Sequence, residues 1–203
     1  MIVAALDLEG VLTPEIWINV AERTGIEELR LTTRDEPDYD VLMKHRLKVL
    51  AANGLGLPDI QAVIGSMAPL DGARDFLDRL RERSQVIVLS DTFYQFAAPL
   101  MQQLALPTLF CHNLEVDGDG RVVDYQIRLK DHKRMAVRAF RELNFTTIAA
   151  GDSYNDTAML AEADAGILFS PPDNVVKEFP QFPVTRTYSE LDQALLEAER
   201  RCS

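Results

Sequence analysis

The chain has 203 residues, of which 47% are hydrophobic and 26% are charged, as in an average globular protein. This length suits one core domain with a modest insertion, and the composition excludes a wholly disordered chain. Asp and Glu number 32 against 21 Lys and Arg, so the net charge is −11. Such an acidic chain is a poor partner for nucleic acid or an anionic membrane surface. An anionic substrate would therefore need local positive charge or a metal.

Cysteine usage and hydropathy indicate the compartment. Cys111 and Cys202 form no CxxC pair, which predicts free thiols in a reducing environment. No apolar run approaches the roughly 18 residues of a membrane span. The apolar start 1–6 has no basic flank and stops at Asp7, too short for a signal peptide. We therefore expect a cytoplasmic protein with no membrane or nucleic-acid partner.

The first predicted element is a strand over Ile2–Leu6. This apolar run lacks polar alternation, which is typical of a strand buried on both faces of a parallel sheet. Helices alone are expected in the next part of the chain, because proline starts, glycine stops and apolar residues recur at helical spacing. These helices occupy three segments: 14–25, Tyr39–Asn53 and Pro58–Met67.

Strands and helices alternate after Pro69. Helical stripes centre on Phe76, Phe96, Val137, Met159 and Leu195, and Asp117–Gly120 marks the turn of a β-hairpin over 114–127. The remaining predicted strands are Val86–Leu89, Thr108–Cys111, Thr146–Ala150 and Ala165–Phe169. This alternation predicts an α/β fold with a Rossmann-like parallel sheet. The core domain would comprise 1–13 and 70–203, with a small helical cap over 14–69 inserted after the first strand.

Residues with catalytic chemistry follow the predicted strands. Carboxyl ends of parallel strands meet at one edge of an open α/β sheet, where ligands bind. We therefore expect a cluster of carboxylates with one hydroxyl and one ammonium. Its members are Asp7 and Glu9 after the first strand, Ser90 after the second, Lys133 opening the helix before the fourth, and Asp152 and Asp156 after the fourth.

Such a cluster suits phosphoryl transfer. Carboxylates that crowd together repel, and a hard cation such as Mg²⁺, which prefers oxygen ligands, relieves that repulsion. Ser90 and Lys133 would bind phosphate oxygens. One carboxylate would then attack phosphorus while a second moved a proton.

These residues resemble the motifs of the haloacid dehalogenase superfamily of aspartate-nucleophile phosphatases. Asp7–Val11, Ser90, Lys133 and Gly151–Asp156 match its four motifs in order, with a helical insertion after the first. Each motif alone is weak, whereas four in order over essentially the whole chain are a strong signal. The resemblance implies an aspartyl-phosphate intermediate on Asp7.

The chain is most similar to the phosphoserine phosphatase branch. There Glu15 would bind the amino group of O-phospho-L-serine and Arg46 its carboxylate. Three runs resemble a bifunctional subgroup of this branch, which also transfers the phosphoryl group to L-homoserine: Asp7–Val11, Leu89–Phe93 and Ala150–Asp156. This likeness implies serine and threonine biosynthesis and suggests a homodimer.

The resemblance also implies roles for the remaining residues. Glu9 would be the general acid and base, although the family usually has aspartate there. Mg²⁺ would be held by Asp7, the Glu9 carbonyl and Asp152. Asp156 is either a further ligand or a support for Lys133 or a metal-bound water. Phosphate would be bound by Ser90, the Asp91 amide, Lys133 and Asn155, with Asp91 replacing the usual small residue.

Several alternatives stay open. Lys130 competes with Lys133 for the phosphate-binding role, and the substrate could be another small phosphorylated metabolite. The Glu9 departure leaves room for a binding protein without catalysis. A dehalogenase would use Asp7 on carbon without metal, which Asp152 and Asp156 argue against. A receiver domain is disfavoured because it lacks a cap after its first strand. The three histidines show no metal-ligand spacing and receive no role.

Overall fold

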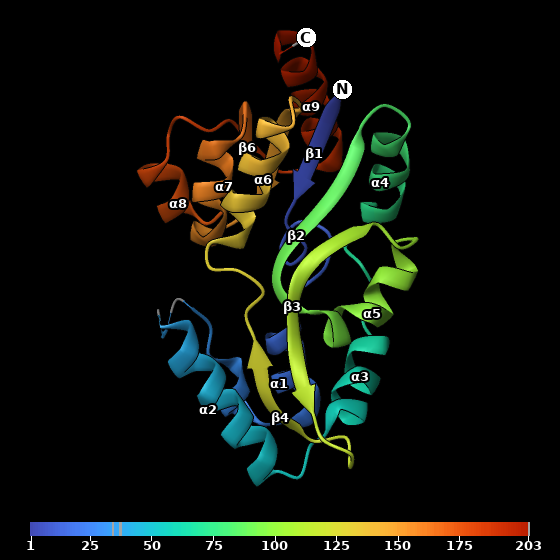
Figure 1. The fold of residues 1–203 in the computed structure, drawn as a ribbon, viewed down its shortest axis with the longest axis vertical. Helices are drawn as coiled ribbons and strands as arrows, with labels where there is room; N and C mark the ends of the chain where they lie inside the picture. Colours follow the sequence, from blue (N-terminus) through green and yellow to red (C-terminus); the bar gives the residue numbers. More distant parts are fainter. Residues whose placement is uncertain (34, 37, 203) are drawn as a thin grey trace.

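The fold is built on a mostly parallel sheet (Figure 1), seen in a computed structural model that describes residues 1–33, 35–36 and 38–202. In this part of the chain seven strands lie in the order β4-β3-β2-β1-β5-β6-β7. At the centre, β1 (Ile2–Leu6) pairs in parallel with β2 (Gln85–Phe93) and β5 (Thr146–Gly151). The predicted α/β class with a parallel sheet is thus confirmed.

The outer strands include one antiparallel pair. The predicted hairpin is confirmed, but its first strand is longer than predicted. The strand expected to end at Cys111 continues to Val116, so it pairs in parallel with β2 and antiparallel with β4. The short β7 was not predicted. These outer strands are β3 (Thr108–Val116), β4 (Val122–Gln126), β6 (Ala165–Phe169) and β7 (Val184–Thr185).

Helices cover both faces of the sheet and bury alternate residues of its strands. Ala4 and Leu6 of β1 join one hydrophobic cluster, whereas Val3 and Ala5 join another. This period of two places successive side chains on opposite faces. The first face carries α4 (Ala73–Arg81) and α9 (Tyr188–Cys202); the second carries α6 (His132–Glu142), α7 (Thr157–Glu162) and the unpredicted α8 (Asp173–Glu178).

A further group of helices lies at the end of the molecule away from both termini (Figure 1). Its first helix ends at Gly25, whose φ of 71° is the left-handed conformation that glycine adopts readily. The group buries its apolar side chains against α5 (Tyr94–Gln103), β3 and β4. The boundary between a core of 1–13 and 70–203 and a cap of 14–69 stays a prediction. The helices are α1 (Ile16–Thr24), η1 (Glu27–Arg30), α2 (Tyr39–Ala52) and α3 (Leu57–Gly65).

The pairing of β2 with β3 is irregular near the carboxyl end of β2. Pairing with β3 is regular up to Leu89 opposite Phe110 and resumes at Phe93 opposite His112. Ser90–Thr92 therefore span a stretch that a single residue of β3 covers, as in a bulge, which re-aims side chains locally. We had predicted that the strand stops before Ser90. It continues instead to Phe93, with the bulge inside it.

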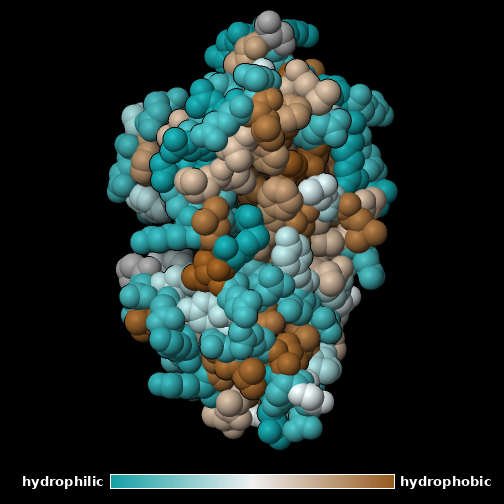
Figure 2. Space-filling model, viewed as in Figure 1, coloured by the Kyte–Doolittle hydropathy of each residue, from teal (hydrophilic) through white to brown (hydrophobic). Residues whose placement is uncertain are grey.

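Some hydrophobic residues remain at the surface of the molecule. On the face drawn in Figure 2, hydrophobic residues gather along the middle between hydrophilic segments. Val123, Ile127 and Leu129, on and just after the edge strand β4, remain exposed. Among the described helices, none combines the length and apolar character needed to cross a membrane.

We predict that Gly166→Ala destabilises the sheet. A Cβ at Gly166 would lie 2.5 Å from the carbonyl oxygen of Leu160, where α7 packs on β6. Overpacking of this kind costs about 1–3 kcal/mol. Urea denaturation should show that loss, whereas the control Gly118→Ala, where a Cβ meets nothing within 4 Å, should change stability by less than about 0.5 kcal/mol. Equal stabilities of the two variants would contradict this packing.

Candidate active site

A cavity of about 390 Å³ opens where the carboxyl ends of β1, β2 and β5 face the cap helices. Nine of the ten residues singled out from the sequence line it, and the tenth, Asp156, lies fully buried behind them. The sheet contributes the seven residues that follow its strands or open α6, and the cap contributes two. They are Asp7, Glu9, Ser90, Asp91, Lys133, Asp152 and Asn155 from the sheet, and Glu15 and Arg46 from the cap.

The ammonium of Lys133 is the hub of the site. Its Nζ lies 2.9 Å from Asp7 Oδ1, 2.9 Å from Asp156 Oδ1 and 3.2 Å from Asp91 Oδ2. Burial alone would lower the pKa of Lys133, but the charges of these carboxylates outweigh it and raise that pKa well above its usual value. Lys130 is exposed. The geometry thus favours Lys133 over Lys130 as the lysine of the site.

Asp7 is held at the end of β1. Its backbone N–H donates to the Ala150 carbonyl at 2.9 Å, and its Oδ1 accepts from the Leu8 N–H at 2.7 Å. Burial and then the nearby charge of Asp156 raise the pKa of Asp7 well above its usual value, although Lys133 opposes both. The site therefore holds more negative charge than its own lysine neutralises.

Asp156 supports the site from behind. Its Oδ1 accepts from Lys133, and its Oδ2 accepts from the N–H of Asp152 at 2.9 Å and of Ser153 at 3.1 Å. Gly151 allows this close approach, because a Cβ there would lie 2.3 Å from the Cβ of Asp156. The carboxylate of Asp156 is thus committed to hydrogen bonds on both oxygens.

The residues present fit a divalent cation. Carboxylate oxygens of Asp7, Asp152 and Asp156 lie within 4.8 Å of one another. An all-oxygen set with excess negative charge suits Mg²⁺ better than a softer metal. The loop after β1 approaches Asp152 closely at Gly10, whose φ is +81° and where a Cβ would lie 2.5 Å from Asp152 Cγ.

Glu9 connects the cluster to the cap. Its Oε2 accepts from the N–H of Ile16 at 2.7 Å, at the start of α1. Burial and then the charge of Glu15 raise the pKa of Glu9 to about 8. This shift favours the protonated form of Glu9, the form that a general acid requires.

Arg46 reaches the cavity from α2 in a restrained position. Its guanidinium lies 4.5 Å from the centre of the Trp17 ring, and Nη2 donates to the Leu31 carbonyl at 2.8 Å. Burial lowers the pKa of Arg46 to about 10, so the group stays positively charged. Its buried Nε has no hydrogen-bond partner in the described part of the chain.

Asp91 makes contacts that the sequence did not predict. Its carboxylate turns toward Lys133 and two histidines, His112 and His132, to which we gave no role. Tyr39 of the cap donates to the Asp91 carbonyl at 2.9 Å. One feature of the sequence could have predicted these contacts: a negatively charged Asp91 next to a phosphate-binding residue needs a positively charged or hydrogen-bonding partner. Other lining residues not foreseen are Trp17, Ile18, Thr32, Thr33, Tyr39, Thr92, Ser153, Tyr154 and Asn174.

Comparisons with known proteins agree with this geometry. Residues 3–164 match the model of the haloacid dehalogenase-like hydrolases. The chain is 61% identical over 201 residues to phosphoserine phosphatase ThrH of Pseudomonas aeruginosa, covering 99% of this chain and 98% of that one. It is 63% identical over 199 residues to a phosphoserine phosphatase of Pseudomonas syringae pv. tomato, covering 98% and 84%. The chain belongs to the haloacid dehalogenase-like hydrolase family, as its motifs predicted.

Solved structures support the same fold. A phospho-aspartyl intermediate analogue of phosphoserine phosphatase has a TM-score of 0.75 at 20% identity, covering 95% of this chain and 97% of that one. An apo phosphoserine phosphatase has a TM-score of 0.74 at 20% identity, covering 91% and 93%. Likeness at this identity establishes the fold alone.

We predict that Asp156→Asn lowers the free energy of unfolding by about 3 kcal/mol, because it breaks a buried ion pair. The new amide can still accept from the Asp152 N–H, but its NH₂ group would then face the Lys133 ammonium. Urea denaturation measures the loss. Asp119→Asn, at a hairpin position with 77% of its side chain exposed, is the matched control and should be neutral. Equal effects of the two substitutions would contradict the structural role of Asp156.

Proposed function

We propose that this chain is a Mg²⁺-dependent phosphoserine phosphatase that acts through an aspartyl-phosphate on Asp7 and also transfers the phosphoryl group to homoserine. The observation that carries the proposal is the composition of one cavity. It combines the residues of four strand-end motifs with a buried arginine from the cap. The near full-length similarity to phosphoserine phosphatase ThrH supports the choice of substrate.

In the first step, a carboxylate oxygen of Asp7 attacks the phosphorus of O-phospho-L-serine. Glu9 donates its proton to the serine oxygen that leaves, so no free alkoxide forms. In the second step, deprotonated Glu9 takes a proton from water, which attacks the aspartyl-phosphate and releases phosphate. Ser90, the Asp91 amide, Lys133 and Asn155 bind the phosphoryl oxygens in both steps.

Asp7, the Glu9 carbonyl and Asp152 would hold Mg²⁺. When bound, the ion supplies positive charge that offsets the clustered carboxylates and stabilises charge on the transferring phosphoryl group. Asp156 would support Lys133 instead of binding the metal, because its two oxygens already accept hydrogen bonds from Lys133, Asp152 and Ser153.

The amino-acid part of the substrate would be recognised by the cap. Arg46 lines the cavity with a guanidinium fixed over Trp17, a planar cation suited to the substrate carboxylate. Glu15, which also lines the cavity, would receive the substrate ammonium group. These two side chains have opposite charges, which matches an α-amino acid and gives an uncharged alcohol phosphate no equivalent contact.

Transfer to homoserine follows the same chemistry. Homoserine carries the same amino and carboxyl groups as serine, so Arg46 and Glu15 could hold it after serine leaves. Its hydroxyl would then replace water in the attack on the aspartyl-phosphate. The likeness of 7–11, 89–93 and 150–156 to the bifunctional subgroup supports this part of the proposal. The homodimer and the cytoplasmic location stay predictions.

The first experiment supplies O-phospho-L-serine and Mg²⁺, with and without L-homoserine. Free phosphate and O-phosphohomoserine are followed together, and Asp7→Asn serves as the inactive control. We expect both products. Phosphate alone would contradict the transfer, and neither product would contradict the substrate assignment and favour another phosphate ester or a binding role.

We predict that Glu9→Gln lowers kcat/KM by an amount that depends on whether the leaving group of the substrate needs a proton. The value of kcat/KM for O-phospho-L-serine should fall at least about a hundredfold, because its alkoxide leaving group needs a proton. The value for p-nitrophenyl phosphate, whose leaving group needs none, should fall by less than about fivefold.

The pH dependence of the wild-type enzyme provides the companion measurement. Glu9 loses its proton as the pH rises through its pKa of about 8, so kcat/KM for O-phospho-L-serine should decline above that pH. The same profile for p-nitrophenyl phosphate should stay level there. A parallel decline for both substrates would show that Glu9 is not the acid.

A further inference from the structure

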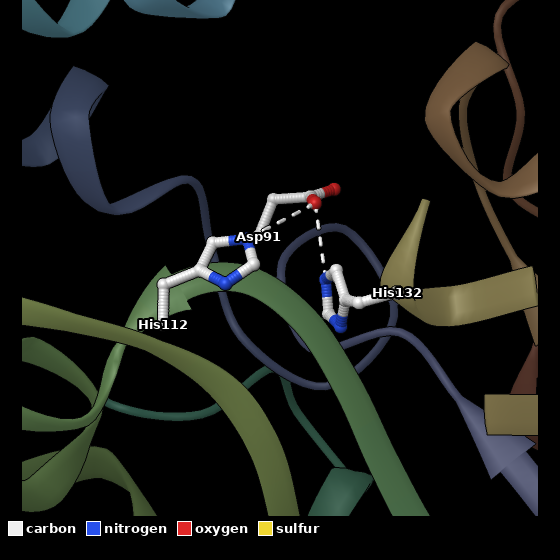
Figure 3. Close-up of side chains that lie close together, drawn as sticks. All are labelled: Asp91, His112 and His132. Atoms are coloured by element: carbon white, nitrogen blue, oxygen red, sulfur yellow. Dashed lines mark hydrogen bonds and ion pairs between the residues drawn. The ribbon is translucent and has the colours of Figure 1, made fainter. Parts of the chain in front are cut away.

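Asp91, His112 and His132 form a cluster beside the cavity, which we call the Asp91–histidine cluster (Figure 3). Two imidazoles from different elements converge on one oxygen, Asp91 Oδ1. The Nε2 of His132 lies 3.1 Å from it and the Nε2 of His112 lies 3.8 Å from it. Both histidines are buried, with side chains 3% exposed.

The neighbours of the other ring nitrogens fix the tautomers. The backbone N–H of Arg128 donates to His112 Nδ1 at 3.2 Å, and the Arg128 guanidinium Nη2 lies 3.3 Å from His132 Nδ1. Both groups can only donate, so each Nδ1 must be an acceptor. Each imidazole is therefore neutral, with its proton on Nε2, facing Asp91.

This proton arrangement decides between two uses of the cluster. Two histidines and a carboxylate also occur in metal sites, but a metal needs the lone pair of the nitrogen that faces it. Here Nε2 of both rings carries a proton. His132 donates a hydrogen bond to Asp91 Oδ1 at 3.1 Å, whereas His112 faces the same oxygen at the longer distance of 3.8 Å. Burial would raise the pKa of Asp91, but Lys133 and then the two histidines hold it well below its usual value.

We propose that His112 and His132 are positioning residues, which hold the Asp91 carboxylate so that its second oxygen fixes the Lys133 ammonium beside Asp7. The proposal rests on the proposed function, in which Lys133 binds the transferring phosphoryl group. Asp91 Oδ1 accepts from His132 and faces the N–H of His112, while Oδ2 lies 3.2 Å from Lys133 Nζ. One carboxylate thus links the buried imidazoles to the reacting centre.

The geometry explains why a third anchor matters. Lysine has a flexible four-carbon side chain, and two contacts leave its ammonium free to swing about the line that joins them. Asp7 follows β1, Asp156 lies in η2 (Tyr154–Asp156) and Asp91 lies in the bulged part of β2, so together they fix one position.

The residue that precedes His132 and Lys133 has an unusual backbone conformation. Asp131 has a φ of 54°, a left-handed conformation that is uncommon outside glycine and asparagine or aspartate. The next two side chains, His132 and Lys133, are both buried at the start of α6. These consecutive side chains contact opposite oxygens of Asp91, His132 at Oδ1 and Lys133 at Oδ2.

The first test reads the tautomers and needs no substrate. The chain has three histidines, so long-range ¹H–¹⁵N spectra of the protein at pH 7.5 give three ring patterns. His112→Gln and His132→Gln each remove one pattern and assign it. We expect neutral rings protonated on Nε2 at both positions. A ring protonated on Nδ1, or a doubly protonated ring, at either position would overturn the proposal.

The second test measures kcat and KM with p-nitrophenyl phosphate as well as O-phospho-L-serine. A failure of the phosphoserine assignment then leaves this test intact. His132→Leu, which removes the donor, should lower kcat about tenfold to a hundredfold with KM changed less than about threefold. His132→Gln, which keeps a terminal N–H donor, should retain kcat within about threefold. His112→Leu should cost less than His132→Leu, since its contact is longer.

A double-mutant comparison separates positioning from general packing. In an Asp91→Asn background, His132→Leu should lower kcat less than about twofold further, because the carboxylate through which it acts is gone. His45→Gln in the cap is the matched control and should leave kcat unchanged. A full additional loss in the Asp91→Asn background, or no loss of kcat in His132→Leu, would overturn the proposal. The proposal would also be overturned if the Mg²⁺-loaded enzyme bound Zn²⁺ stoichiometrically and His132→Gln abolished that binding.

Discussion

The buried ammonium of Lys133 is the interaction on which the site depends. It lies within 3.2 Å of carboxylates from three segments of the chain, Asp7, Asp91 and Asp156, which would otherwise repel one another in a poorly solvated place. These three carboxylates, with Asp152 close by, surround a single ammonium. The remaining negative charge creates the demand for a divalent cation. Because the positive charge of Lys133 is local, a chain of net charge −11 still presents a cation to an anionic ligand in this cavity.

Much of the site was predictable because its residues depend on short patterns and on one topological rule. An apolar run followed by Asp7, or by Gly151 and Asp152, predicts a buried strand with polar residues at its end. Parallel pairing then brings these ends together, although they are far apart in sequence. Lys133 could not be separated from Lys130 by spacing, since both precede or open the same helix. Burial separates them, because Lys133 is buried at the start of α6 whereas Lys130 is exposed.

The remaining features could not be read from the sequence, because they depend on contacts between distant elements. His112, His132 and Asp91 have no common spacing, and they meet only because the bulge of β2 brings Asp91 opposite the start of α6. Their tautomers depend on Arg128, which lies over the Phe110 ring at 5.3 Å. The short α8 was missed for a similar reason. Six residues give little periodic signal, and the helix is held by the burial of Val175 against the sheet.

Two hydrogen bonds join the chemistry of the core to the cap. The Oε2 of Glu9 accepts from the Ile16 N–H at the start of α1, and the Asp91 carbonyl accepts from the Tyr39 hydroxyl of α2. A protonated carboxyl whose Oε2 is held in this way keeps its Oε1 proton available for a leaving group. The additional methylene of Glu9, which marked a departure from the usual aspartate, gives its carboxyl the reach to contact the cap. In the proposed mechanism, α1 would thus orient the proton donor, and a movement of α1 would also move Glu9.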